Sequence, residues 1–321
     1  MPSEPQIAFL YEHPTWSEKL IQSFQNRGIA LELINIAQLD FNPDTETPPF
    51  ALAVNRINIM PSKERSPSIA AHTIHYLTWL ETMGVRMING SRAHFTGASK
   101  AVQNGLFSKL GLPCPASAAV HQVSDIPKAA ERIGFPLIIK PNIGGSGSGI
   151  SKYETREELS AALDSGTIEL GIDGTGLVQE YIQSDGYVYR VEVLGENLFY
   201  SIRQKMKANT FNYCAADGCS VSSQPNRTQK DDFDFCALNA ADKNEPLIQP
   251  FSVDTEILNQ VTAIVRQARA DLGGVEYLMD TRTKKPCFYD FNPYSNFVTN
   301  GEDLFGFSPE NRFIDYIMSM V

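Results

Sequence analysis

The first residues whose types and spacing could do chemistry are Lys140 and the glycine-rich loop at 144–149. An apolar stretch at 136–139 predicts a buried strand ending at Lys140, and the loop Gly-Gly-Ser-Gly-Ser-Gly follows shortly after it. Small residues let backbone N–H groups approach phosphate oxygens, which a nearby lysine can neutralise. The spacing matches neither a Walker A motif nor a dinucleotide fingerprint. The pattern indicates phosphate binding, with a flexible turn between two strands as the alternative.

A second group consists of Glu276, Asp290 and Asn292, which we expect on two adjacent strands near the C-terminus. Side chains alternate along a strand, so Asp290 and Asn292 share one face. Hard oxygen ligands of this kind suit Mg²⁺, which takes one or two carboxylates and completes its shell with water and phosphates. The alternative is that these side chains are simply solvated, as we expect for Asp280 in a turn.

Basic residues form a third group. Lys100 precedes the loop, Arg203 and Lys205 end a predicted strand, and Lys207 and Asn212 follow it. Positive side chains that converge on a transferring phosphoryl group supply the positioning and charge stabilisation that such chemistry needs. Each of them could instead be an ordinary surface charge. Together, the three groups predict a site for phosphoryl transfer.

The elements that must position these residues begin with an alternation of strand and helix. Apolar runs predict the strands of a small parallel α/β unit, and helical spacing predicts the helices between them. The expected strands lie at 6–11, 30–36, 50–54 and 85–88, and the expected helices at 17–25 and 69–83. Residues 90–97 are the expected exit from this first domain. No dinucleotide loop follows Tyr11, which argues against a dehydrogenase built on this unit.

The rest of the chain has a mixed helix and strand pattern. Helices are expected at 98–110, 124–133 and 255–272, and strands at 136–140, 177–182, 187–194, 198–203, 274–280 and 286–292. Gly or Asp turns separate the three strands between 177 and 203, which suggests an antiparallel sheet. Residues 217–250 are polar and broken by prolines, so we expect a long loop there. The predicted fold class is α/β, with an α+β C-terminal part.

Composition excludes several classes of protein. A chain of 321 residues with 42% apolar content can bury a large core, in two or three subdomains. The net charge of -10 cannot hold a nucleic acid backbone, and no apolar run approaches the roughly 20 residues of a membrane span. We expect a soluble, cytoplasmic protein. Its five scattered cysteines should be reduced structural thiols, with Cys214 and Cys219 as an alternative reactive or metal-binding pair.

The order of these features resembles the ATP-grasp superfamily, and within it the RimK-like branch of ribosomal-protein glutamate ligases and amino-acid ligases. The matching strings, in chain order, are NGSRAHFTGASK, FPLIIKPNIGGSGSGIS, LVQEYI, YRVEVLGENLFYSIRQ, GGVEYLMD and FYDFNPYSNF. Their joint order is far more specific than any one of them. The resemblance implies an ATP-grasp fold preceded by a small Rossmann-like α/β domain. The implied domains are 1–96, 97–176 with the phosphate loop, and 177–321 with the metal and substrate sites.

The resemblance also implies roles for individual residues. Lys100 and Lys140 would hold ATP phosphates, and Arg203 would act in catalysis by steadying an acyl phosphate. Further contacts to ATP would come from the loop and from a stretch lining the adenine, that is from Gly144, Gly145, Ser146, Gly147, Ser148, Gly149, Gln179, Glu180, Tyr181 and Ile182. Glu276, Asp290 and Asn292 match the metal ligands, for Mg²⁺ or alternatively Mn²⁺. The candidate substrate-binding residues are Arg190, Lys205, Lys207, Asn212 and Asn296.

The chain departs from the family pattern in three places. Asp290 stands where the family usually has glutamate and Glu276 where relatives often have aspartate, so the two exchanges offset each other in reach. Tyr189 replaces the acidic residue that commonly precedes the family's arginine, so a ribose contact is expected from Asp185 instead. Residues 217–250 are longer than the corresponding segment, which suggests a different or enlarged substrate.

The sequence thus predicts an ATP-dependent carboxylate–amine ligase that works through an acyl phosphate on an amino acid or peptide, and that forms a dimer or tetramer as its relatives often do. One alternative keeps the fold but uses a thiol or hydroxyl acceptor, or phosphorylates without ligation. Another is a nucleotide-binding regulatory protein that has lost turnover. Lys140, Arg203 and the three candidate metal ligands are all present, which favours the enzyme.

Overall fold

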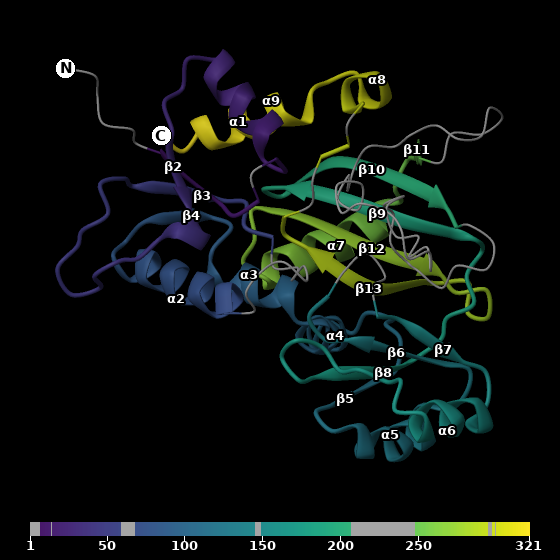
Figure 1. The fold of residues 1–321 in the computed structure, drawn as a ribbon. Helices are drawn as coiled ribbons and strands as arrows, with labels where there is room; N and C mark the ends of the chain where they lie inside the picture. Colours follow the sequence, from purple (N-terminus) through teal and green to yellow (C-terminus); the bar gives the residue numbers. More distant parts are fainter. Residues whose placement is uncertain are drawn as a thin grey trace, which may run out of the picture.

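The computed structural model of the chain describes residues 7–13, 15–58, 68–144, 149–206, 248–294, 297–298 and 300–321. These residues form three β-sheets with helices packed around them (Figure 1). The first sheet is N-terminal and parallel, the second is central and antiparallel, and the third is C-terminal and antiparallel. This arrangement confirms the predicted mixed α/β class.

The N-terminal sheet has the strand order β2-β1-β3-β4 among the described residues, and its pairs are parallel. It consists of β1 (Ile7–Tyr11), β2 (Glu32–Asn35), β3 (Leu52–Asn55) and β4 (Arg86–Ile88). Helix α1 (Glu18–Asn26) packs Phe24 against Phe9 on one face, and α2 (Ser68–Thr82) packs Leu77 near Leu10 on the other. Burial on both faces explains why β1 is apolar without alternation.

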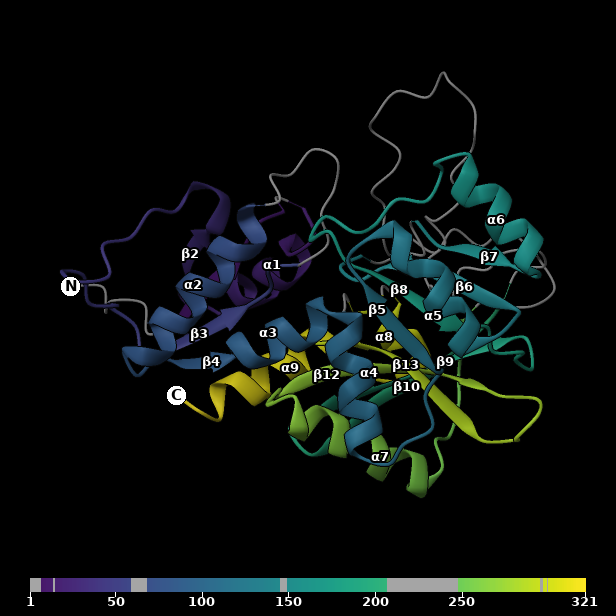
Figure 2. The ribbon, with the colours of Figure 1, turned by 90° about the horizontal axis from the view of Figure 1, so that it is seen from below.

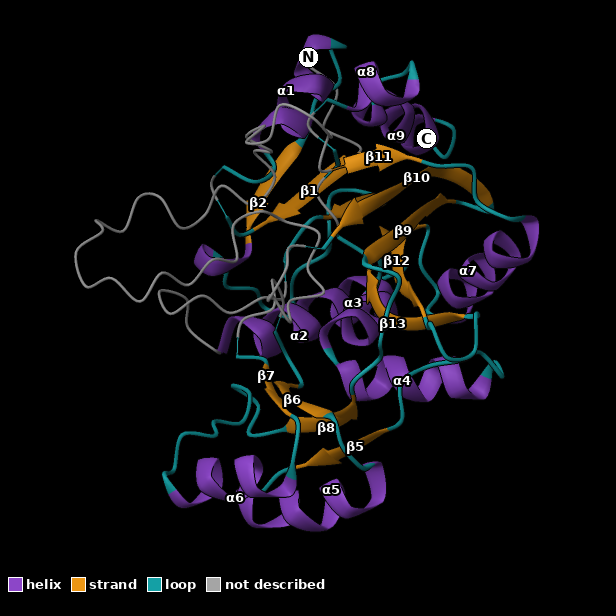
Figure 3. Cartoon of the chain, turned by 90° about the vertical axis from the view of Figure 1, so that its right-hand side faces the viewer, coloured by secondary structure: helices purple, strands orange, loops and turns teal. Residues whose placement is uncertain are grey.

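The central sheet has the order β5-β8-β6-β7 in the part of the chain that is described. Its strands are β5 (Ser117–Val120), β6 (Leu137–Pro141), β7 (Ser151–Tyr153) and β8 (Gly176–Glu180). Helices α5 (Ile126–Ile133) and α6 (Arg156–Asp164) cover its outer face, away from the C-terminal sheet (Figure 3).

The C-terminal sheet has the order β11-β10-β9-β12-β13. Its strands are β9 (Tyr187–Leu194), β10 (Asn197–Lys205), β11 (Ile248–Pro250), β12 (Leu272–Met279) and β13 (Pro286–Asn292). Helix α7 (Thr255–Gln267) packs Val261, Ile264 and Val265 against one face of this sheet. The chain continues into α8 (Gly301–Phe305) and α9 (Pro309–Met318).

Two short helices connect the N-terminal sheet to the rest of the molecule. Helix α3 (Ser91–Ala98) is followed by α4 (Lys100–Lys109), which contacts both β13 and β5 and lies between the C-terminal and central sheets (Figure 2). The helix predicted at 98–110 is confirmed as α4, which begins at Lys100 because Ser99 has an extended backbone and caps it through its Oγ, which accepts from the Val102 N–H. The expected exit at 90–97 instead contains helix α3.

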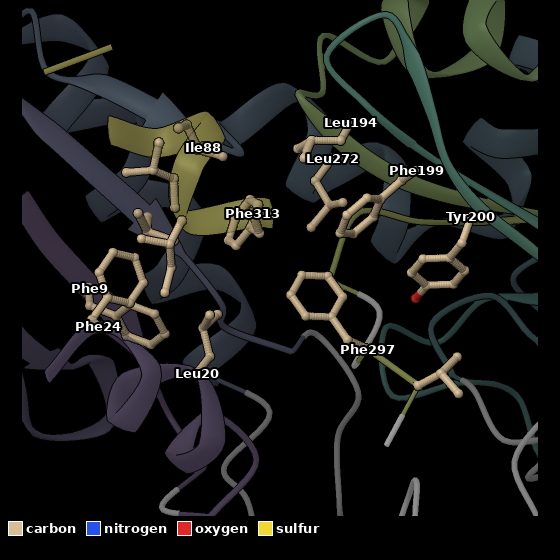
Figure 4. Packing of buried hydrophobic residues seen from close by; sticks show 14 of the residues in the cluster. Phe9, Leu20, Phe24, Ile88, Leu194, Phe199, Tyr200, Leu272, Phe297 and Phe313 are labelled. Atoms are coloured by element: carbon tan, nitrogen blue, oxygen red, sulfur yellow. The ribbon is translucent and has the colours of Figure 1, made fainter. Parts of the chain in front are cut away.

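The N-terminal and C-terminal parts share one hydrophobic core. Phe9 and Phe24 on one side and Phe199 and Leu272 on the other belong to a single buried cluster, in which Phe313 of α9 takes part (Figure 4). The N-terminal unit is therefore not an independent lobe. Its residues are held at a defined place beside the C-terminal sheet.

Strand β8 changes the predicted domain boundary. It pairs with β5 and β6, so the central sheet continues through Glu180 and does not end at residue 176. The expected antiparallel sheet of the three strands between 177 and 203 is correct only for β9 and β10. Turn signals locate strands along a chain but do not specify their partners. Most of the predicted loop at 217–250 lies outside the described residues, and its end forms β11.

Candidate active site

Lys140 lies at the end of β6, in a buried position. The preceding residues of β6 are apolar and fully buried, and Lys140 itself is 3% exposed. Burial, and after it the nearby charge of Lys100, lower the pKa of Lys140 to about 7, while Asp290 opposes the shift. The structure therefore brings together Lys100, Lys140 and Asp290, which are far apart in the sequence.

Lys100 is the first residue of α4, and its ammonium is paired with a candidate metal ligand. Its Nζ lies 2.7 Å from Asp290 Oδ1, and both side chains are largely buried. Asn142, just beyond β6, holds this end of α4. Its Oδ1 accepts from the Ala101 N–H at 3.0 Å and from Ser99 Oγ at 3.0 Å. Asn142 was not among the predicted site residues, although it lies between Lys140 and the loop.

The described ends of the glycine loop agree with close backbone packing. Gly149 has φ +73°, and a Cβ there would lie 2.9 Å from Pro141 Cγ, so both its conformation and its surroundings require glycine. Gly144 lies next to the same proline. The predicted ATP contacts at Gly145, Ser146, Gly147 and Ser148 lie outside the described residues.

The candidate metal ligands lie side by side on the hairpin of β12 and β13. Glu276 pairs directly with Asp290, and Asn292 lies on the same face as Asp290, opposite Gly274. A bulge at this point leaves Tyr289 as the extra residue, and its hydroxyl donates to Glu276 Oε2 at 2.6 Å. Two carboxylates and an amide oxygen are a donor set that fits magnesium with nucleotide phosphates.

No cluster of three or more His, Cys, Asp or Glu side chains suited to a metal occurs among the described residues. The set of Glu276, Asp290 and Asn292 has only two carboxylates. It therefore matches a metal that phosphate oxygens help to hold, rather than one enclosed by protein ligands.

Arg190, rather than Arg203, shares the face of Glu276. Arg190 pairs across the ladder with Glu276 on β12 and with Ile202 on β10. Arg203 is the next residue on β10, so its side chain leaves from the opposite face. There its Nε and Nη2 donate to Gln249 Oε1 at 3.1 and 3.0 Å. The structure therefore does not bring the predicted catalytic arginine together with the candidate metal ligands.

Arg190 is oriented by a buried carboxylate. Its Nε donates to Glu192 Oε1 at 2.7 Å, and Glu192 is fully buried. Burial alone would lower the pKa of Arg190, but Glu192, Tyr200 and Glu276 together raise it, so the guanidinium stays charged. A fixed positive charge thus lies on the sheet face that carries Glu276.

Arg56 adds a second, partly buried guanidinium to this face, from the N-terminal domain. It follows β3, and burial lowers its pKa to about 10 while Glu192 and Tyr200 oppose the shift. Sequence analysis did not single it out, because its approach to β9 depends on the docking of two distant parts of the chain.

The predicted adenine stretch lies where the central and C-terminal sheets meet. Ile182 belongs to a buried cluster with Ile138 of β6 and Leu278 of β12. Lys152 Nζ lies 3.8 Å from the centroid of the Tyr181 ring, and Glu180 Oε1 accepts from Arg282 Nη2 at 2.7 Å. Gln179 is 2% exposed, and no hydrogen-bond partner of its Oε1 is found among the described residues.

The remaining predicted residues are less informative. Asp185 accepts from the Tyr189 hydroxyl at 2.8 Å and from the Tyr187 N–H, so its carboxylate is engaged locally. Lys205 ends β10, while Lys207, Asn212 and Asn296 lie outside the described residues, as do Cys214 and Cys219. Cys114 and Cys287 are free thiols, and burial raises the pKa of Cys287 to about 12. No helix in the described ranges is long and apolar enough to cross a membrane.

Comparison with known proteins agrees with this geometry. Residues 100–193 match the family model of the ATP-binding domain of the carbamoyl-phosphate synthase L chain. A probable alpha-L-glutamate ligase of Shewanella denitrificans is 28% identical over 214 residues, which cover 64% of this chain and 71% of that protein. A RimK domain ATP-grasp protein of Sphaerobacter thermophilus superposes with a TM-score of 0.65 at 16% identity, over 97% of this chain and 98% of that one. The chain has the ATP-grasp fold and is similar to RimK-like proteins and to glutamate ligases.

Other ATP-grasp proteins share the fold at lower identity. The ATP-grasp ligase PsnB, in a complex with a minimal precursor, Mg and ADP, has a TM-score of 0.64 and 14% identity, covering 99% of this chain and 98% of that one. The D-alanine–D-alanine ligase of Bacillus anthracis has a TM-score of 0.64 and 12% identity, covering 98% and 96%. The ligase names of the relatives, together with the ATP-binding family model, support an enzyme that forms C–N bonds.

Proposed function

We propose that this ATP-grasp protein joins a substrate carboxylate to an amine through an acyl phosphate, on an amino acid or a peptide. A carboxylate oxygen attacks the γ-phosphorus of ATP, and ADP leaves. The amine nitrogen then attacks the acyl carbon and loses a proton, and phosphate leaves with the original carboxylate oxygen. Glutamate-ligase names among the relatives and the peptide precursor bound by PsnB support this substrate class.

The observation that carries this proposal is the convergence of Lys140, Lys100 and Asp290 from three separate elements. Two lysines directed at one place repel each other unless an anion joins them. A single carboxylate balances them only in part, because burial and Lys100 still lower the pKa of Lys140 to about 7. Nucleotide phosphates would supply the missing negative charge.

We assign the role of metal ligands to Glu276, Asp290 and Asn292, because they present oxygen atoms side by side on one sheet face. Bound magnesium would screen charge on the phosphates during transfer. Asp290 accepts from Lys100 through Oδ1, and its second oxygen, Oδ2, would bind the cation. Arg190 lies on the same face and is held by Glu192, so we assign to it the charge stabilisation that was predicted for Arg203.

The test is ADP and phosphate formation from ATP and Mg²⁺ across a panel of amino acids and short peptides, with the products weighed by mass spectrometry. We expect acceptor-dependent ADP formation and a product heavier than its substrate by an amide condensation. If no member of the panel yields an amide, the ligase proposal fails. ADP formed with a thiol or hydroxyl acceptor, or a phosphorylated product, would favour the alternative activity of the same fold.

Asp290→Asn tests the metal site directly. The variant keeps the shape of the side chain but loses its charge, so turnover should fall by roughly a hundredfold or more. Asp315→Asn is the matched control, because Asp315 is an exposed carboxylate that pairs with Arg27 far from the site. Full activity of Asp290→Asn would remove this residue from the metal site.

A further inference from the structure

Tyr294 lies two residues beyond Asn292 and is joined to it by a hydrogen bond. The Tyr294 N–H donates to Asn292 Oδ1 at 2.8 Å, and Tyr294 is 5% exposed. We propose that Tyr294 is a positioning residue that orients the Asn292 amide toward the metal and ties it to the N-terminal domain. This inference rests on the proposed function, in which Asn292 is a metal ligand.

The Tyr294 hydroxyl is held by two residues of the N-terminal domain. Asn55 at the end of β3 donates to it through Nδ2 at 3.0 Å, and His94 Nδ1 lies 2.9 Å from it. The Asn55 amide is oriented by the Ile57 N–H, which donates to its Oδ1 at 3.0 Å. These contacts come from β3 and α3, which precede Tyr294 by about two-thirds of the chain.

The protonation of this group follows from its burial. His94 is fully buried, and burial lowers its pKa to about 3, so the imidazole is neutral. Burial also raises the pKa of the Tyr294 hydroxyl well above its usual value, so the hydroxyl keeps its proton. The hydroxyl thus accepts from Asn55 and makes a second hydrogen bond with His94 Nδ1.

The backbone beside Tyr294 is held from the same side. Asn89, which follows β4, donates through Nδ2 to the Pro293 carbonyl at 2.8 Å and to the Leu272 carbonyl at 2.7 Å. Its Oδ1 accepts from the Asp271 N–H at 2.7 Å. Asn89 therefore ties residue 293 to the start of β12. The segment that carries Asn292 is placed by three buried N-terminal side chains.

This arrangement has a chemical consequence at Asn292. An amide oxygen has two lone pairs, so Oδ1 can accept the Tyr294 N–H and still coordinate a cation. The hydrogen bond selects the rotamer that presents the oxygen rather than the NH₂ group. Groups that orient a metal ligand in this way typically change metal affinity or activity by roughly 10- to 100-fold when removed.

Tyr294→Phe tests the proposal, because it deletes only the hydroxyl. ADP binding is measured by titration calorimetry at a series of Mg²⁺ concentrations and without metal. We expect the affinity for ADP without metal to be unchanged. The Mg²⁺ concentration that gives half of the maximal increase in ADP affinity should be roughly 10- to 100-fold higher than in the wild type. Tyr316→Phe is the matched control, since it deletes a hydroxyl that donates to Asp271 at 2.8 Å, and its Mg²⁺ response should equal the wild type.

His94→Phe is a second variant that keeps an aromatic ring beside Tyr294 and removes the ring nitrogen that its hydroxyl contacts. The same change in Mg²⁺ response is expected from it. A wild-type Mg²⁺ response in folded Tyr294→Phe or His94→Phe overturns the inference while leaving the proposed function intact. If wild-type protein does not bind ADP at all, the proposed function fails and the inference fails with it.

Discussion

Lys140 should take up a proton when the nucleotide binds. In the unliganded protein its pKa is about 7, first because of burial and then because of Lys100. Nucleotide phosphates would stabilise the ammonium and return its pKa toward the ordinary value near 10.5. The uptake should therefore be measurable at a pH where the free protein holds Lys140 mostly neutral and the phosphates are already ionised.

The magnitude follows from the pKa of about 7. At pH 8 about 0.9 of the Lys140 side chains are neutral before binding, so uptake should approach about 0.9 proton per ADP. At pH 7 it should be about 0.5. The same shift makes the stability of the fold depend on pH. Between pH 7 and 10.5 the Lys140 side chain is protonated in the unfolded chain but neutral in the folded chain. Lys140 therefore contributes a rise in stability of the unliganded protein with pH across that window.

The assay is titration calorimetry of ADP at pH 8 in buffers of different ionisation enthalpy, where the slope of the observed enthalpy counts protons. Lys140→Met is the control, because it keeps the length of the side chain and cannot take up a proton. We expect the slope near pH 8 to vanish in that variant. An equal proton uptake in wild type and Lys140→Met would refute the reasoning.

Two further substitutions test the sheet geometry. Arg190→Lys should lower kcat about tenfold or more, because it loses the planar fork held by Glu192. Arg203→Lys should change kcat by less than about threefold. If steady-state kinetics show a larger effect for Arg203→Lys than for Arg190→Lys, the assigned sheet faces are wrong. Gly274→Ala should cost about 1–3 kcal/mol in denaturant unfolding, because its Cβ would overlap the buried Glu192 carboxylate. A Cβ at Gly105 of α4 would meet open space, so Gly105→Ala should be stabilising. If both variants lose the same free energy of unfolding, the close contact between residue 274 and Glu192 is refuted.

Local pattern was enough to predict most elements and the placement of some candidate site residues. An apolar β-rich run must be buried, so the placement of Lys140 at the end of a buried strand followed from β6 alone. Alternation likewise put Asp290 and Asn292 on one face, as the ladder with β12 has them. These features depend on residues that are close together in the chain, so they can be predicted from the sequence.

Only the tertiary structure decided which distant residues meet. The face of Arg203 depends on its register with Tyr189, and the partner of β8 depends on the order of strands in a sheet. Neither is visible in a single stretch of sequence, because pairing is set by the packing of whole elements.

The same holds for the contacts between domains. Tyr294 meets Asn55 and His94 only because the N-terminal and C-terminal parts bury one common core. The sequence by itself predicted an ATP-grasp chain, with Lys140, the glycine loop and Asp290 as the proposed parts of a phosphate and metal site. The tertiary structure decided that Lys100 pairs with Asp290, that Arg190 shares a sheet face with Glu276, and that Asn55 and His94 contact Tyr294, since each is a long-range contact fixed by burial.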